Sequence, residues 1–105
     1  MSAIRSRRDF SRIYTRGHRG RSDGITAFVV ATEPTERRLG LAVSKAHGTA
    51  VVRNRVRRRL KAAFAHSGVP LGTDVVLRPD PGITVQFQEL VNHIEMAVTR
   101  AVGAK

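Results

Sequence analysis

The stretch at residues 51–64, VVRNRVRRRLKAAF, combines a run of basic residues with an apolar pattern at helical spacing. Residues 53–61 contain five arginines and one lysine, with no acid among them. Apolar side chains recur every three or four residues through the same run, which is the period of a helix that packs along one face. These apolar residues are Val52, Val56, Leu60, Ala63 and Phe64. The stretch therefore predicts a folded helix with a buried face beside a concentrated positive charge.

The charge on this helix favours a polyanionic partner. Like charges one turn apart, such as Arg53 and Arg57, repel by roughly 0.2–0.5 kcal/mol per pair, and a bound polyanion would remove that cost. An ordinary solvated helix face usually carries both signs of charge, and a membrane-surface or calmodulin-target helix would carry bulkier apolar residues. The side chains expected to face the polyanion lie beside the buried face on a helical wheel: Arg53, Asn54, Arg57, Arg58 and Lys61.

Length and composition predict one RNA-binding domain that spans residues 1–105. The chain has 105 residues and a net charge of +11, and the basic residues are concentrated in residues 1–21 and 53–61. A strongly basic small domain most often binds nucleic acid. There is no cysteine, which suits a reducing compartment, and no apolar run has the length of a membrane span. We therefore expect a cytoplasmic protein without a membrane partner.

Local signals predict the elements on either side of the basic helix. Ser6 and Asp9 have the spacing of a capping box, so a first helix should run to Arg16, with Gly17 as a left-handed cap. Residues 18–24 are polar and rich in glycine, which predicts a loop. Residues 25–31 and 38–44 read as two strands, which we expect to pair in antiparallel fashion.

The second half of the chain repeats this alternation of helix and strand. Thr49 is a suitable N-cap for the basic helix, and Ser67 and Gly68 should end it. Residues 74–78 predict a buried strand, and Thr84 should cap a last helix over residues 85–102, packed through Phe87 and the apolar residues that follow it. The order predicts an α/β protein, more closely an α+β two-layer sandwich, in which helices cover one side of a small mixed sheet.

Aromatic residues suggest how such a domain would hold RNA. Phe10 and Tyr14 lie on one side of the first predicted helix, and strand alternation places Thr26 and Phe28 on one face of the sheet. Aromatic rings stack on unpaired bases, while arginine and lysine contact phosphates. If these rings share a surface, that surface suits an extended single strand better than a duplex. The second predicted strand has small side chains on one face, which would let another backbone or a ligand approach closely: Gly40, Ala42 and Ser44.

The sequence shows no clear arrangement of residues typical of an enzyme active site. The four histidines, His18, His47, His66 and His93, lie in separate segments without the spacing of metal ligands. The acids are scattered, and no serine has a histidine and an acid at motif spacing. The residues alone therefore predict a protein that binds and positions RNA, with no catalytic residue and no metal or cofactor site of its own.

The chain resembles the bacterial ribonuclease P protein subunit, and the residues that carry the likeness are in three places. Residues 53–61, RNRVRRRLK, match the family's signature of an arginine-asparagine pair followed by spaced basic residues. Residues 43–51, VSKAHGTAV, come directly before this signature and are part of the likeness. The first predicted helix and its cap contribute Asp9, Phe10, Tyr14 and Gly17. The resemblance extends over nearly the whole chain.

This resemblance implies a partner for a catalytic RNA, one protein per RNA, in the enzyme that removes 5′ leaders from precursor tRNA. The RNA subunit would hold the active site and its Mg²⁺ ions, and the basic helix would meet that RNA. By position, the single-stranded leader would lie in a cleft lined by Phe10, Tyr14, Thr26 and Phe28. Further basic contacts would come from Arg7, Arg8, Lys45 and Arg55.

The same resemblance implies a fold with the element order α-β-β-(β)-α-β-α and a left-handed β-α-β crossover, where general rules would predict a right-handed one. Two other functions remain open on the residues. A ribosomal or other structural RNA-binding protein could use the same small basic domain, and a standalone nuclease would need a catalytic constellation that the sequence does not show.

Overall fold

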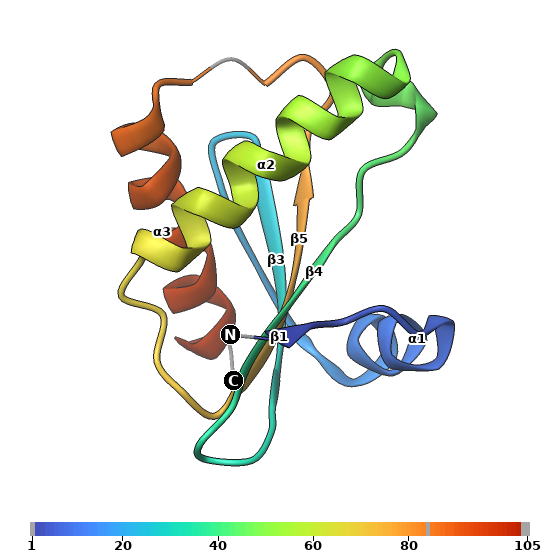
Figure 1. Cartoon of the computed structure of the whole chain (residues 1–105). Helices are drawn as coiled ribbons and strands as arrows, with labels where there is room; N and C mark the ends of the chain where they lie inside the picture. Colours follow the sequence, from blue (N-terminus) through green and yellow to red (C-terminus); the bar gives the residue numbers. More distant parts are fainter. Residues whose placement is uncertain (1, 84, 104–105) are drawn as a thin grey trace.

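A computed structural model describes residues 2–83 and 85–103 of the chain. These residues form three α-helices and five strands (Figure 1). In chain order the elements are β1 (Ser2–Ala3), α1 (Arg7–Arg16), β2 (His18–Ser22), β3 (Ile25–Ala31), β4 (Arg37–Leu41), the 3-10 turn η1 (Lys45–His47), α2 (Ala50–His66), β5 (Thr73–Pro79) and α3 (Phe87–Gly103). None of the helices in the described residues is long and apolar enough to span a membrane.

The strands form one mixed sheet in the order β1-β4-β5-β3-β2. β5 lies in the middle, antiparallel to β3 and parallel to β4, and β1 adds a short parallel edge beside β4. Helices α2 and α3 lie on one face of this sheet, and α1 lies on the other (Figure 1). The α+β class and the predicted element order are confirmed. The expectation that helices cover only one side of the sheet is wrong, because α1 packs on the second face.

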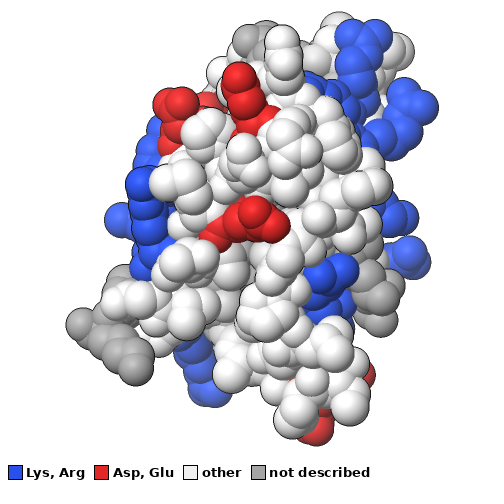
Figure 2. Space-filling view, turned by 90° about the vertical axis from the view of Figure 1, so that its left-hand side faces the viewer, with Lys and Arg blue, Asp and Glu red and all other residues white. Residues whose placement is uncertain are grey.

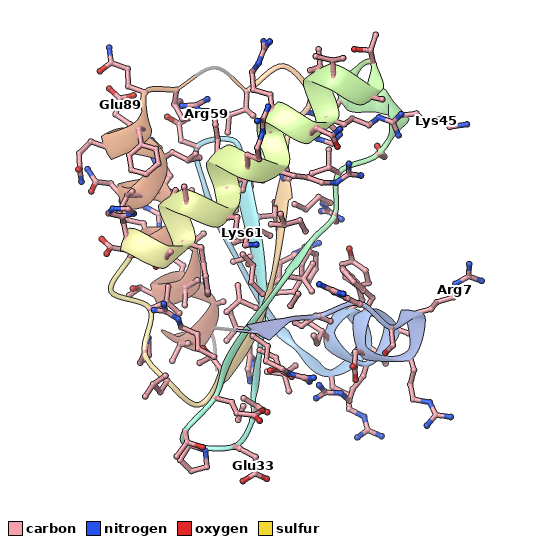
Figure 3. The ribbon with its side chains drawn as sticks, in the orientation of Figure 1. Arg7, Glu33, Lys45, Arg59, Lys61 and Glu89 are labelled. Carbon is pink, nitrogen blue, oxygen red and sulfur yellow. The ribbon has the colours of Figure 1, made fainter. Side chains whose placement is uncertain are left out.

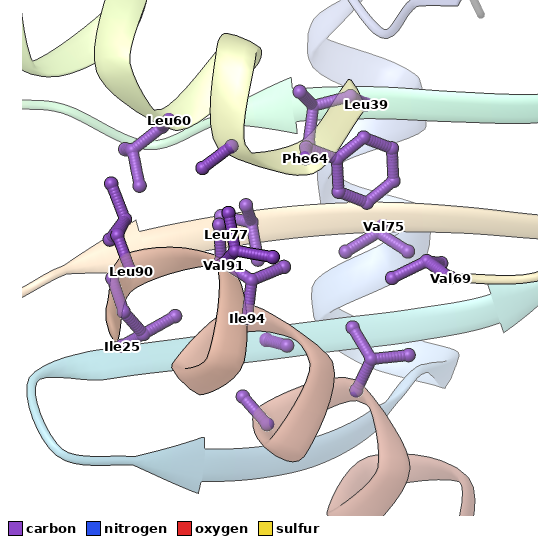
Figure 4. Close-up of a cluster of buried hydrophobic side chains, with 14 of the residues drawn as sticks. Ile25, Leu39, Leu60, Phe64, Val69, Val75, Leu77, Leu90, Val91 and Ile94 are labelled. Carbon is purple, nitrogen blue, oxygen red and sulfur yellow. The ribbon is translucent and has the colours of Figure 1, made fainter. Parts of the chain in front are cut away.

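The main core lies between the sheet and helices α2 and α3 (Figure 4). From α2, Leu60 and Phe64 are at most 1% exposed, and Ile94 of α3 is fully buried. Strand alternation directs Ile25, Ala27 and Val29 of β3 into the same cluster, as the sequence pattern predicts. Burial of these side chains on two helices and three strands holds the basic helix against the sheet.

A smaller cluster joins α1 to the other face of the sheet. Ile4, Ile13, Phe28 and Val76 are buried there, and Phe10 packs against them. Polar contacts complete this junction, because Asp74 of β5 is fully buried and accepts hydrogen bonds from two arginines. The helices on both faces of the sheet are therefore attached to β5, which is the central strand.

Residues 18–24 are not a loop, as the sequence suggested, since His18–Ser22 forms β2. Asp23 and Gly24 both have positive φ angles, of 39° and 91°, and make the two-residue turn that joins β2 to β3. Gly20 lets this polar strand pack closely on α3, because a β-carbon there would collide with the backbone at Ala97 and Ala101. The Asp-Gly turn was the signal for this hairpin, and the prediction missed it.

The pairing predicted for the second strand is also wrong. β4 does not pair with β3, because β5 lies between them and is parallel to β4. The strand also ends at Leu41, before the predicted limit at Ser44. With α2 in front and both strands pointing upward, β5 lies to the left of β4 (Figure 1), so the β4-α2-β5 crossover is left-handed. The family resemblance implied this handedness.

Helix ends differ from the sequence pattern in several places. Ser6 caps α1 by accepting from the Asp9 N–H, and Gly17 ends it with φ −75°, which is not the left-handed conformation predicted. Val52 is 37% exposed because the first turns of α2 extend beyond the strands (Figure 1). Phe87 begins α3 but is 39% exposed. The predicted cap Thr84 lies outside the described residues.

Candidate RNA interface

Helix α2 displays its basic residues on two sides. Thr49 caps its first turn, which contains no acid, so the positive end of the helix dipole and the arginines reinforce one another. Lys61 is directed toward the β1–β4 edge of the sheet, and Arg59 toward the start of α3 (Figure 3). Arg58 is exposed between these two sides. One helix thus offers cations in several directions.

Some of these cations are oriented by hydrogen bonds. Arg57 donates to the Asn54 side-chain carbonyl at 3.2 Å and to the Val43 carbonyl at 3.3 Å, which fixes its guanidinium beside β4. Arg59 donates to the Val85 carbonyl. Arg53 is half-buried, and its Nε is enclosed without a hydrogen-bond partner among the described residues. A guanidinium has five N–H donors, so Arg57 retains free donors for phosphate.

The predicted aromatic residues come together beside α1. The Tyr14 ring meets Phe28 edge to face with ring centres 4.8 Å apart, and Phe10 lies 6.3 Å from Tyr14. Tyr14 is 40% exposed, whereas Phe28 is only 7% exposed. Burial raises the pKa of Tyr14, against an opposing effect of the Arg78 charge. The phenol therefore stays neutral beside an anionic ligand, and Tyr14 is the ring most available for stacking.

Thr26 lies beneath the same surface and is 3% exposed. Its hydroxyl accepts a hydrogen bond from Arg21 at 3.1 Å, and Arg21 also forms an ion pair with Asp80. The hydrogen bond from Arg21 lowers the pKa of Asp80. Thr26 thus presents little of its own surface and is held beneath that of its neighbours.

Three arginines that the sequence prediction omitted lie beside Thr26 and Phe28. Arg19 and Arg21 of β2 pair with Phe28 and Thr26 of β3, and the Arg78 guanidinium lies 5.1 Å from the centre of the Phe28 ring. A hollow of about 310 Å³ lies between them. The alternation in HRGRS would have placed Arg19 and Arg21 on one face had this segment been predicted as a strand.

The remaining predicted basic residues lie farther apart. Arg7 and Arg8 are exposed on the first turn of α1, where Arg7 points away from the sheet, and Lys45 is exposed in η1 near the start of α2 (Figure 3). Arg55 lies on the side of α2 that faces the loop before α3. The structure therefore does not bring these residues into one site, and they surround the helix and the cleft.

The opposite side of the molecule has a different character. Seen from the side of α3, the surface is mostly uncharged, with a few separate acidic groups and with basic groups mainly toward its left and right edges (Figure 2). Glu89 and Glu95 belong to α3. A surface with so little positive charge is poorly suited to a polyanion.

The described residues contain no group of three or more histidine, cysteine, aspartate or glutamate side chains that could hold a metal ion. Asp74, the one fully buried acid, is occupied by Arg12 and Arg38. This donor set does not fit an Mg²⁺ ion, which needs several free oxygen ligands. The arrangement suits phosphate and base contacts instead.

Known proteins with the same features were found by sequence and by structure. The family model described as Ribonuclease P matches residues 2–102. The Ribonuclease P protein component of Clavibacter michiganensis is 38% identical over 104 residues, which cover 94% of this chain and 91% of that protein. The corresponding protein of Shouchella clausii is 33% identical over 102 residues, with 93% and 84% covered.

Solved structures agree with these relatives. The RNase P protein of Staphylococcus aureus superposes with a TM-score of 0.77 at 26% identity, over 94% of each chain. The RNase P protein of Thermotoga maritima has a TM-score of 0.81, over 100% of this chain and 99% of that one; at 21% identity it supports the fold alone. Sequence and fold agree, and the chain belongs to the ribonuclease P protein family.

Proposed function

We propose that this chain acts as the protein subunit of ribonuclease P, in which it binds the catalytic RNA and the single-stranded 5′ leader of precursor tRNA. The observation that carries the proposal is the match of residues 2–102 to the family, with the basic helix α2 at the signature position. Its role is to bind and orient the RNAs so that the 5′ end of tRNA is matured.

The basic helix is suited to contact the RNA subunit. Phosphate contacts from arginine and lysine position an RNA, and the absence of acids from residues 53–61 leaves every cation of the run free of local ion pairs within it. Arg53, Asn54, Arg57, Arg58 and Lys61 are the contacts we propose, with Arg7, Arg8, Lys45 and Arg55 at the periphery. Relief of the repulsion along the helix adds to the driving force.

The cleft beside α1 is suited to the leader. Tyr14 offers an exposed ring, Phe28 and Phe10 support it, and Thr26 forms part of the floor. Arginines at the border supply phosphate contacts, so an extended strand can place its backbone on cations and its bases on rings. A duplex would not expose its base faces to such a surface.

Catalysis in this proposal belongs to the RNA subunit, together with its Mg²⁺ ions. The described part of the protein has no cluster of acids for the metal, so we derive no chemical step from its side chains. Its contribution is positive charge and shape at the junction of two RNAs. We propose one protein per RNA subunit.

Reconstitution tests the proposal. Precursor-tRNA cleavage is measured at low Mg²⁺ with protein alone, RNA subunit alone, and both together. Cleavage only, or far faster, with both components is the expected result, because cations on α2 replace part of the ionic screening that high Mg²⁺ provides. Cleavage by the protein alone would show a standalone nuclease, and no stimulation would contradict the subunit role.

A further inference from the structure

His47 lies where η1, the start of α2 and the end of β5 meet, and the proposed function gives it no role. It is the last residue of η1, it is half-buried, and it lines hollows toward β5 and toward the first turns of α2. Only Gly48, with a φ angle of 119°, separates it from Thr49, whose side chain caps α2 by accepting from the Val52 N–H. A bond that holds His47 therefore also holds the start of the basic helix.

The His47 ring is bonded through both of its nitrogens. Nε2 lies 2.7 Å from the Pro79 carbonyl oxygen, which can only accept, so Nε2 carries a hydrogen and donates. Nδ1 lies 3.1 Å from the Ser44 nitrogen and accepts from its N–H. The Ser44 carbonyl oxygen is 3.2 Å from the same Nδ1 and would accept if the ring gained a second proton. The bond to Pro79 is thus available in either protonation state, and it joins η1 to β5.

The carbonyl group that receives this bond is itself held by the sheet. Pro79 is buried and is the last residue of β5. Directly after it, the Asp80 N–H donates to the Gly24 carbonyl at 2.8 Å, and the Asp80 carboxylate forms an ion pair with Arg21 of β2. His47 therefore attaches the start of the helix to a point that two other strands hold in place.

The start of α2 receives little support from the core. The first turns extend beyond the strands, and Val51 and Val52 are 66% and 37% exposed (Figure 1). Arg53 and Asn54 of the signature belong to this part of the helix. Segments with few buried apolar contacts open at a low free energy. The buried residues of α2 all lie in its second half: Leu60, Ala63 and Phe64.

We propose that His47 is a positioning residue, whose hydrogen bond to Pro79 holds the first turns of α2, with Arg53 and Asn54, in the orientation that meets the RNA subunit. The inference rests on the proposed function and adds to it a residue that does not itself touch RNA. A helix end that is already ordered loses less conformational freedom when it binds. Without the bond, the same RNA contacts form with a larger loss of freedom, so the affinity falls.

Three variants test this role. His47→Ala removes both ring nitrogens, whereas His47→Gln restores a side-chain N–H donor that can reach the place of Nε2. His66→Ala is the matched control, because His66 lies in the last turn of the same helix and its Nδ1 is also hydrogen-bonded to a carbonyl, that of Ala62 at 2.9 Å. Thermal unfolding of all three checks that they fold.

Fluorescence anisotropy measures the affinity of each variant for the RNA subunit at several salt concentrations. His47→Ala should bind about 2- to 10-fold more weakly, the range expected for the loss of one hydrogen bond, while His47→Gln and His66→Ala keep the affinity of the unmodified protein. The slope of log affinity against log salt should stay the same in His47→Ala, because no phosphate contact is lost. A slope reduced by about 0.7–0.9 would show that His47 itself contacts phosphate and would overturn the positioning role.

Hydrogen exchange followed by NMR reports on the helix itself. The Arg53 N–H donates to the Thr49 carbonyl at 2.9 Å, so its exchange follows the opening of the first turn. In His47→Ala this amide should exchange faster, by about the factor that the affinity loses, while the amide of the buried Phe64 exchanges as before. His47→Gln should return the Arg53 amide to its original rate.

Equal affinities of His47→Ala and the unmodified protein for the RNA subunit would overturn the positioning role and leave the proposed function standing. A loss that His47→Gln does not restore would contradict the part assigned to the Pro79 bond. Failure of the unmodified protein to bind the RNA subunit would instead overturn the proposed function.

Discussion

Replacement of Asp74 by asparagine should weaken the attachment of α1 to the sheet and so lower the free energy of unfolding. The Asp74 carboxylate is fully buried and accepts hydrogen bonds from Arg12 at 2.7 Å and from Arg38 at 2.9 and 2.6 Å. Asparagine keeps the shape but removes the charge, and its amide end would face a guanidinium that can only donate. The variant therefore leaves two arginines facing a site that no longer neutralises them.

The size of the expected loss in stability follows from how deeply Asp74 and its two arginine partners are buried. Removal of one member of a buried ion pair costs about 3–5 kcal/mol. Hydrogen bonds to charged groups contribute about 1.5–3 kcal/mol each. Here the side chains of Arg12 and Arg38 remain 31% and 25% exposed, so water can solvate part of the released charge. We expect Asp74→Asn to lower the free energy of unfolding by about 2–4 kcal/mol, which urea denaturation followed by circular dichroism measures at neutral pH.

The pH dependence of that loss has a definite sign. Burial tends to raise the pKa of Asp74, but hydrogen bonds from Arg38 and Arg12 and their charges outweigh it, so the pKa lies below its ordinary value of 3.8. A lowered carboxyl pKa stabilises the folded state fully above the ordinary value, and the stabilisation disappears as the pH falls toward the lower value. The difference between Asp74→Asn and the unmodified protein should therefore be constant near neutrality and shrink in acid below pH 3.8.

Asp80→Asn is the matched control, because its ion pair with Arg21 is exposed on both sides, 49% and 54%. Exposed pairs contribute little to stability, so this variant should unfold close to the unmodified protein. Equal losses for the two variants, or no loss for Asp74→Asn, would refute the view that the buried triad attaches α1.

Three further predictions concern the RNA surfaces and the hairpin. Tyr14→Ala should weaken holoenzyme binding of leader-bearing precursor tRNA by about 1–3 kcal/mol but spare leaderless tRNA, while Tyr14→Phe keeps the ring and the affinity; equal loss for both RNAs would argue against the cleft. Arg58→Ala should lower the affinity for the RNA subunit and reduce the slope of log affinity against log salt by about 0.7–0.9, and an unchanged slope would mean that Arg58 makes no phosphate contact. Gly20→Ala should destabilise the fold by more than about 1 kcal/mol, since its β-carbon would meet the backbone of α3, whereas Gly103→Ala, which has open space, should be tolerated in the same thermal unfolding assay; equal melting temperatures would contradict that packing.

Local patterns in the sequence determined much of this protein. The apolar period and the Thr49 cap predicted α2, and the uninterrupted basic run predicted an RNA partner. Alternation predicted β3 with its limits and its two faces, because each residue of a strand has a side that depends only on its position. These features arise within a few residues of chain and need no knowledge of distant partners.

Only the tertiary structure decided which elements are neighbours. Insertion of β5 between β3 and β4 depends on where the chain returns after α2, and a left-handed return contradicts the usual preference. Exposure of Val52 depends on how far α2 extends beyond the strands, and the burial of Asp74 depends on Arg12 and Arg38 meeting it from two other elements. A pocket of about 490 Å³ between α1 and α2 has the same origin, because Phe10 and Lys61 both line it only through the packing of two helices around the edge of the sheet, which no local pattern encodes.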